Sequence, residues 1–161
     1  MKRISALTTA LLCLIVLAGC AGTNTEDTSV KNPMAEYGTV PEITDKLGFE
    51  PAELPEVTGF HLDKMYIIGS TVASLEYKND AGASATVRTA KDTDTDINGY
   101  QGVDYQKRSA DGREYYFGSF EDGKAYTGYI DKDGIRYGLS AEGVDEGQFN
   151  DMMSYMINTI P

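Results

Sequence analysis

Three Asp-Gly pairs constrain the fold of this chain most, because each supplies the positive-φ residues that a tight hairpin turn needs. They are Asp111-Gly112, Asp122-Gly123 and Asp133-Gly134. Around them lie four runs of strand length, at residues 103–109, 113–120, 125–131 and 135–141. This spacing predicts antiparallel strands that follow one another through short turns.

Upstream of these turns, apolar residues recur with the period of two that is typical of half-buried strands. The alternation begins at Phe60 and Leu62, with Tyr66 and Ile68 on the same predicted face. It continues over residues 72–78 and returns over 83–90 after a loop at 79–82. We therefore predict a single α+β domain over residues 32–161, with an antiparallel, twisted sheet of six to seven strands.

Two capping boxes predict two helices. Thr39 and Glu42 open a short helix over residues 41–47, and Asp145 and Gln148 open a longer one over residues 148–160. The longer helix has one apolar face, formed by Phe149, Met152, Met153, Met156 and Ile160. We expect this face to cover one side of the sheet, although methionine-rich faces also serve as binding surfaces.

Cys20 ends a segment with the features of a bacterial lipoprotein export signal. Lys2 and Arg3 precede an apolar run over residues 6–17, and Leu17-Ala18-Gly19-Cys20 has the small residues of a lipobox. The run is shorter than the ~20 residues that span a bilayer, which disfavours a transmembrane anchor. We predict a signal peptide over residues 1–19, lipid on Cys20, a flexible tether over 20–31, and attachment to the extracytoplasmic face of the cell membrane.

The chain is strongly acidic, with 14 Lys and Arg against 25 Asp and Glu and a net charge of −11. Loss of residues 1–19 would remove Lys2, Arg3 and no acid, so the charge would become −13. Such a chain is repelled by phosphate backbones, and nucleic acid is therefore not an expected partner. Cys13 and Cys20 are the two cysteines, so the predicted mature chain has no disulfide.

Residues 92–99 form an acidic loop that resembles part of a calcium-binding loop. Asp94, Asp96, Asn98 and Gly99 match positions 1, 3, 5 and 6 of that motif. Position 12, which should be a bidentate glutamate, is Tyr105, and no helix pattern flanks the loop. Asp, Asn and Gly are also common turn residues, so we favour a solvated turn and predict no metal site.

The chain contains few residues that are suited to catalysis. His61 is the only histidine, and a zinc site built from one histidine and carboxylates is unusual. No Gly-x-Ser-x-Gly elbow or glycine-rich phosphate loop is present. We therefore predict no catalytic residue and no cofactor, while a hydrolase that uses His61 with a carboxylate or Ser119 remains the alternative.

Seven tyrosines occur between residues 100 and 137, where the predicted hairpins are: Tyr100, Tyr105, Tyr115, Tyr116, Tyr126, Tyr129 and Tyr137. Tyrosine is a favoured strand residue with a half-buried ring, and this is the simpler interpretation. A stacking platform for sugar rings is the functional alternative.

A series of short segments resembles an uncharacterised family of bacterial extracytoplasmic domains, found in small lipoproteins of Gram-positive gut bacteria and in outer portions of some anti-sigma factors. The segments are Asn32-Pro33-Met34-Ala35-Glu36, Lys46-Leu47-Gly48-Phe49, Leu54-Pro55, Leu75-Glu76-Tyr77, Arg88-Thr89-Ala90-Lys91 and Asp96-Ile97-Asn98-Gly99. Met34 stands where the family usually has Trp, and Asn98 where Ser is commoner. The resemblance implies no catalytic residues, and it favours a turn at residues 96–99.

These observations favour a non-enzymatic, membrane-anchored module that binds a small ligand, an envelope polymer or a partner protein. An envelope sensor or regulatory domain is the second interpretation, suggested by the anti-sigma resemblance. Cys20 is the one residue to which the sequence assigns a specific site, that of lipidation.

Overall fold

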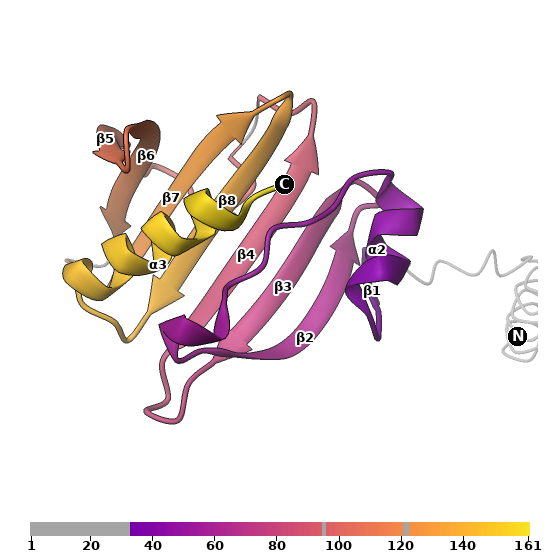
Figure 1. The fold of residues 1–161 in the computed structure, drawn as a ribbon, viewed down its shortest axis with the longest axis horizontal. Helices are drawn as coiled ribbons and strands as arrows, with labels where there is room; N and C mark the ends of the chain where they lie inside the picture. The colour runs from indigo at the N-terminus through magenta and orange to yellow at the C-terminus, as the bar shows by residue number, and fades with distance from the viewer. Residues whose placement is uncertain (1–32, 95, 121–122) are drawn as a thin grey trace, which may run out of the picture. The chain divides into compact units, whose positions relative to one another are not determined.

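The computed structural model describes residues 33–94, 96–120 and 123–161, and residues Asn32–Pro161 form one compact unit (Figure 1). The predicted signal peptide, Cys20 and tether lie outside the described residues. The described strands are β1 (Met34–Glu36), β2 (His61–Ile68), β3 (Val72–Lys78), β4 (Ser84–Lys91), β5 (Gln106–Ala110), β6 (Arg113–Phe120), β7 (Ala125–Lys132) and β8 (Ile135–Glu142). The helices are α2 (Val40–Leu47), α3 (Glu146–Thr159) and the 3-10 turn η1 (Glu56–Thr58).

All eight strands form one antiparallel sheet in the order β1-β2-β3-β4-β8-β7-β6-β5. The predicted antiparallel sheet is confirmed, but the count of six to seven strands is wrong. The additional strand is β1, whose three residues are too few to show alternation and which pairs with β2 through Met34 and Ile68. The strands also do not form one continuous meander. Two meanders, β1–β4 and β5–β8, meet where β4 pairs with β8.

The predicted Asp-Gly turns have the expected backbone geometry where the structure describes both residues. Asp111 and Gly112 have φ values of 50° and 78°, and Asp133 and Gly134 have 53° and 77°. Two successive positive φ values are those of a type I′ turn, whose twist matches the strands that it joins. These turns close the β5–β6 and β7–β8 hairpins.

Strand β2 differs from its predicted pattern. The register of β2 against β3 shifts between Leu62 and Lys64, as at a β-bulge. A bulge inserts one extra residue, so the alternation changes phase after it. Met65 and Ile67 are therefore buried, at 8% and 5% exposure, whereas the sequence pattern placed Tyr66 and Ile68 on that face.

Both capping boxes are present. The Thr39 backbone N–H donates to the Glu42 carboxylate at 3.2 Å, and the Glu42 N–H donates to the Thr39 hydroxyl at 3.4 Å, at the start of α2. Helix α3 begins at Glu146, before the expected residue 148, because its cap is Asp145 and Gln148 is already its third residue. The helix consequently starts one half-turn earlier than predicted.

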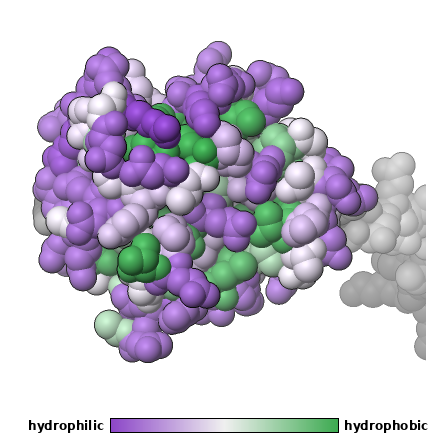
Figure 2. All heavy atoms as spheres, in the orientation of Figure 1, coloured by the Kyte–Doolittle hydropathy of each residue, from purple (hydrophilic) through white to green (hydrophobic). Residues whose placement is uncertain are grey.

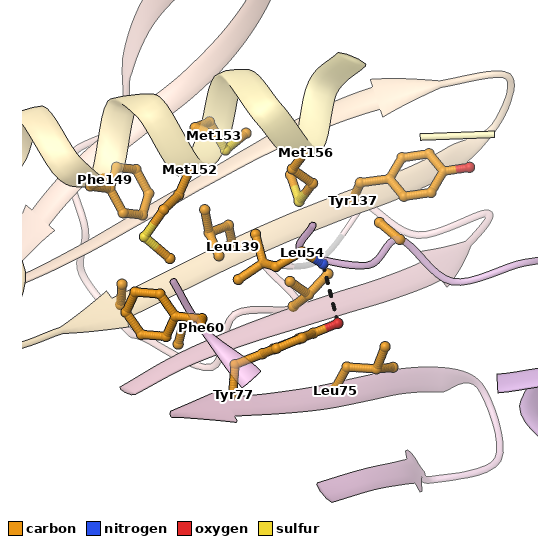
Figure 3. Packing of buried hydrophobic residues seen from close by; sticks show 14 of the residues in the cluster. Leu54, Phe60, Leu75, Tyr77, Tyr137, Leu139, Phe149, Met152, Met153 and Met156 are labelled. Atoms are coloured by element: carbon orange, nitrogen blue, oxygen red, sulfur yellow. Dashed lines mark hydrogen bonds between the residues drawn. The ribbon is translucent and has the colours of Figure 1, made fainter. Parts of the chain in front are cut away.

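Helix α3 packs across the β7 and β8 half of the sheet, and its predicted apolar residues are buried (Figures 1 and 3). We call this side of the sheet the helix face. Gly128 of β7 faces the helix, and a Cβ there would be in ordinary van der Waals contact with Phe149 and Met153 at 3.5 Å but only 2.7 Å from the Tyr116 carbonyl oxygen of β6. The predicted packing of the C-terminal helix on one face is confirmed.

The helix face has a second cover, the segment at residues 50–55, which lies between α2 and η1 and contains Pro51 and Pro55. The Ala52 N–H donates to the buried Thr89 hydroxyl at 3.0 Å, and the Leu54 N–H donates to the Tyr77 hydroxyl at 3.2 Å (Figure 3). Phe60 adds its ring to the same core at 4% exposure. The segment before β2 therefore covers the first meander, and α3 covers the second.

The outer surface on this side is mainly hydrophilic, with apolar residues in separate areas (Figure 2). Within the described ranges, no helix is long and apolar enough to cross a membrane.

Candidate binding surface on the loop face

The opposite side of the sheet is crossed by the connection from β4 to β5, and we call it the loop face. The connection, residues 92–94 and 96–105, leaves the centre of the sheet and reaches the far edge. Its Ile97 carbonyl accepts a hydrogen bond from the Arg88 guanidinium at 3.0 Å. Val103 fills the space over Gly118 of β6, where a Cβ would lie 2.2 Å from its methyl group. No local pattern in the sequence indicated that this loop would cover a face.

Asn98 holds the crossing loop against the sheet. The residue is 3% exposed, and its side-chain amide donates to the Thr127 hydroxyl at 2.8 Å and to the Gly128 carbonyl at 3.1 Å. Among the described residues its Oδ1 has no hydrogen-bond partner, and it lies against Gly138, where a Cβ would approach it to 2.2 Å. The absence of a side chain at Gly138 thus makes room for Asn98.

The residues that matched the calcium motif have separate roles in the structure. One carboxylate oxygen of Asp96 accepts from the Asn98 N–H at 2.9 Å, and the other accepts from the Tyr105 hydroxyl at 2.8 Å. The Asn98 side chain points into the sheet, while Asp94 is exposed. Among the residues that the structure describes, no three His, Cys, Asp or Glu side chains are placed to hold a metal ion.

His61 and Ser119 lie far apart. His61 is exposed at the start of β2, opposite Lys78, and Ser119 is exposed on β6, opposite Tyr126. Strands β3, β4, β8 and β7 separate β2 from β6. At about 4.8 Å between strands, the two positions are roughly 24 Å apart, which is too far for a shared proton transfer.

The tyrosines divide between the two faces. Tyr115, Tyr126 and Tyr137 are buried in the core on the helix face. Tyr100, Tyr105, Tyr116 and Tyr129 are on the loop face or in the crossing loop, and they are only partly covered. Three of the seven thus have the buried ring of a core strand residue, and four remain partly accessible.

Tyr116 and Tyr129 form a stack on the loop face. They are paired across β6 and β7, with ring centroids 4.7 Å apart and planes 16° apart. The Arg136 guanidinium lies 4.3 Å from the centre of the Tyr129 ring. The Tyr105 ring meets Tyr129 edge-on at 5.1 Å. We call Tyr105, Tyr116, Tyr129 and Arg136 the tyrosine stack.

An ion pair fixes the cationic end of this stack. Arg136 donates from Nε and Nη2 to the two carboxylate oxygens of Asp131, at 2.7 and 2.9 Å. This bidentate geometry is the strong form of the Arg–carboxylate pair, and the arginine side chain is only 13% exposed. The hydrogen bond to Asp131 also raises the pKa of Arg136.

The phenol groups of Tyr105 and Tyr129 stay protonated at neutral pH, because both have a raised pKa. Burial raises the pKa of Tyr105 to about 12, with further help from the hydrogen bond to Asp96. Burial also raises the pKa of Tyr129, against the opposing effect of Arg136. These two residues therefore present neutral rings with hydroxyl groups that donate and accept.

A hollow of about 580 Å³ lies where β6 and β7 approach the end of α3. Arg113 and Lys132 line it, and both donate to backbone carbonyls near the helix end, at Ile157 and Ile160. Cations favour this end of a helix because of its dipole. The two charges therefore hold α3 in place.

No protein-family model, curated protein or solved structure matches the chain. The resemblance to extracytoplasmic lipoprotein domains stays a prediction.

The sequence pointed to the tyrosines as a group but did not identify Asp131, Arg136 or Gly138. For Tyr116 a signal existed in the strand parity, since the residue lies between the buried Tyr115 and Phe117 and therefore faces the other side of the sheet. The pairing of Tyr116 with Tyr129 depends on the register between β6 and β7, which local sequence signals do not specify.

Proposed function

We propose that this protein is a non-enzymatic binding module, held by lipid on Cys20 at the extracytoplasmic face of the cell membrane, and that the tyrosine stack contacts its ligand. One observation carries the proposal. Tyr116 is 37% exposed, yet its ring is fixed in a stack whose other members are packed or ion-paired. Exposed aromatic rings that are already ordered lose little entropy on binding, and they are frequent energetic centres of binding sites.

The separation of His61 from Ser119 supports binding over a hydrolase built on that pair. The acidic net charge of −11 supports a partner other than nucleic acid or an anionic lipid surface.

The binding role is tested by crosslinking and co-purification from intact envelopes, with the parent protein and two alanine variants. Tyr116→Ala removes the exposed ring of the stack, whereas Tyr155→Ala removes a comparably exposed tyrosine (41%) on α3 and serves as the matched control. We expect Tyr116→Ala to lose the captured component and Tyr155→Ala to keep it. Equal capture by both variants would show that the stack is not the binding surface.

The anchor is tested separately by Cys20→Ser. We expect the variant to keep residues 1–19, to lack the lipid mass on its N-terminal peptide, and to move from the detergent phase in phase partitioning. A variant that matures and partitions like the parent would contradict the lipobox prediction.

A further inference from the structure

We propose that the tyrosine stack binds a neutral polysaccharide, with the apolar face of one pyranose ring stacked on Tyr116. This inference rests on the proposed function, because it names the ligand class of the same surface.

The strand order determines which ring face is available. β7 lies between β8 and β6, so Arg136 and Tyr116 approach Tyr129 from opposite sides. Tyr129 is thus covered on both faces, and the second face of Tyr116 points towards β5 at the sheet edge. Within residues 33–94, 96–120 and 123–161, no other ring or guanidinium stacks on that second face. A ligand ring with one flat apolar face can therefore extend the stack beside the side chain of Lys107, the residue of β5 that is paired with Tyr116.

Polar groups flank this open ring face. Lys107 of β5 is paired with Tyr116, and its ammonium lies 2.6 Å from the Glu114 carboxylate. The side chains of Lys107 and Glu114 are 54% and 66% exposed, so both keep hydrogen-bonding capacity towards solvent. Together they offer donors and acceptors without net charge, directly beside an aromatic plane.

A pyranose ring matches this arrangement. It presents C–H groups on one face, which pack on an aromatic ring, and hydroxyl groups around its rim, which both donate and accept hydrogen bonds. A purely apolar ligand would cover Lys107 and Glu114 without replacing their contacts to water, at a cost in free energy. A polyanion would meet the carboxylates of Glu114, Asp131 and Asp96 on a chain of net charge −11.

The tyrosine stack is also ordered before binding. The Arg136–Asp131 pair holds one end, and Tyr105 is tied to Asp96 at 2.8 Å against the edge of Tyr129. A ligand would therefore not have to order these side chains, which matters for single sugar rings because each supplies little binding free energy.

The test uses the mature, full-length protein in micelles of a detergent without a sugar headgroup, titrated with hexamers of β-1,4-linked N-acetylglucosamine and of β-1,4-linked glucose. Binding is measured by NMR, from saturation transfer to the oligosaccharide and from shifts of the tyrosine ring signals. We expect at least one hexamer to bind, and Tyr116→Ala to weaken it about tenfold or more. Tyr116→Phe should bind within about twofold of the parent, because it keeps the ring face. Tyr155→Ala is the matched control and should bind normally.

Two further arms separate this inference from its alternatives. The double variant Lys107→Met with Glu114→Gln keeps the Tyr116 ring but removes both charges beside it, and it should weaken binding of the hexamer several-fold. Failure of both hexamers to bind, or binding that Tyr116→Ala leaves unchanged, would overturn the polysaccharide inference. If Tyr116→Ala nevertheless lost the component captured from envelopes, the binding module would stand with a ligand of another class, such as a protein.

Discussion

Asn98 shows how a single side chain can decide where a long connection lies. Its amide supplies two hydrogen bonds to β7, and its remaining oxygen lies over the bare backbone of Gly138. The sequence marked Asn98 as a turn residue or a calcium ligand, because spacing alone does not tell whether a side chain points outward or inward. Only the pairing of Gly138 with Tyr129, across β8 and β7, creates the space that it fills.

This contact predicts strong coupling between the two residues. Gly138→Ala should destabilise the fold by about 1–3 kcal/mol, because its Cβ would overlap Asn98 Oδ1 at 2.2 Å. Asn98→Ala should cost about 1–3 kcal/mol, since it leaves the Thr127 hydroxyl and the Gly128 carbonyl without this donor.

The double variant should be less destabilised than the sum of the single ones, because Asn98→Ala removes the atom that the new Cβ would overlap. Urea unfolding of all four proteins measures the coupling free energy. Additive changes would show that the loop does not rest on Gly138.

At the scale of elements, the sequence predicted the hairpin turns but did not predict which strands pair. Asp111-Gly112 and Asp133-Gly134 form the predicted turns because two positive φ values favour few residue types. The neighbours β4 and β8 are separated by three other strands in the chain, and no local signal specifies such a contact. Because β4 pairs with β8, strand β5 lies at the far edge of the sheet, and the connection from β4 to β5 crosses the loop face. The tyrosine stack lies on this same face.

The segment that covers the first meander predicts a specific effect at Tyr77. Tyr77→Phe keeps the buried ring but leaves the Leu54 N–H without its acceptor. The free energy of unfolding should fall by about 1–3 kcal/mol at pH 7. Tyr66→Phe is a suitable control, since that side chain lies on the other face of the sheet. Equal stability of the two variants in urea unfolding would contradict the role of this hydrogen bond.

The crossing loop also predicts the response to calcium. Both oxygens of Asp96 already accept hydrogen bonds and Asn98 points inward, so the six to eight oxygen ligands that calcium prefers are not assembled. We expect the melting temperature to rise only slightly and without saturation in millimolar calcium, and equally in magnesium. A saturable, calcium-selective rise that Asp96→Ala abolishes would make this loop a metal site.

For the whole molecule, the tyrosines predict a loss of stability in alkali. Burial raises the pKa of Tyr77 to about 12, and Tyr105 also reaches about 12, whereas an unfolded tyrosine ionises near 10. Because the folded pKa is the higher one, the contribution is complete below pH 10 and is lost as the pH rises towards 12. Tyr77, which is 3% exposed, should account for about 2–3 kcal/mol of that loss, and the more exposed Tyr105 for less.

Urea unfolding at pH 8, 10 and 11, with tyrosinate absorbance as a second readout, measures this dependence. The destabilisation of Tyr77→Phe relative to the parent should shrink as the pH rises, since the variant has no phenol to ionise. A difference that stays constant to pH 11 would contradict the raised pKa.

The strand order also sets how the domain would carry a load. The described chain enters the sheet at β1, and Tyr116 is on β6, six strand spacings away, or about 29 Å. If, as proposed, lipid on Cys20 holds one end in the membrane and Tyr116 binds a fixed polymer, tension would run across the strands, and the hydrogen-bonded ladders between β1 and β6 would bear it in series. The ladder of β1, with three paired residues, is the shortest and would open first. Detachment of β1 would add a few residues to the chain segment between the anchor and the sheet, while the tyrosine stack and the hydrophobic core stayed intact.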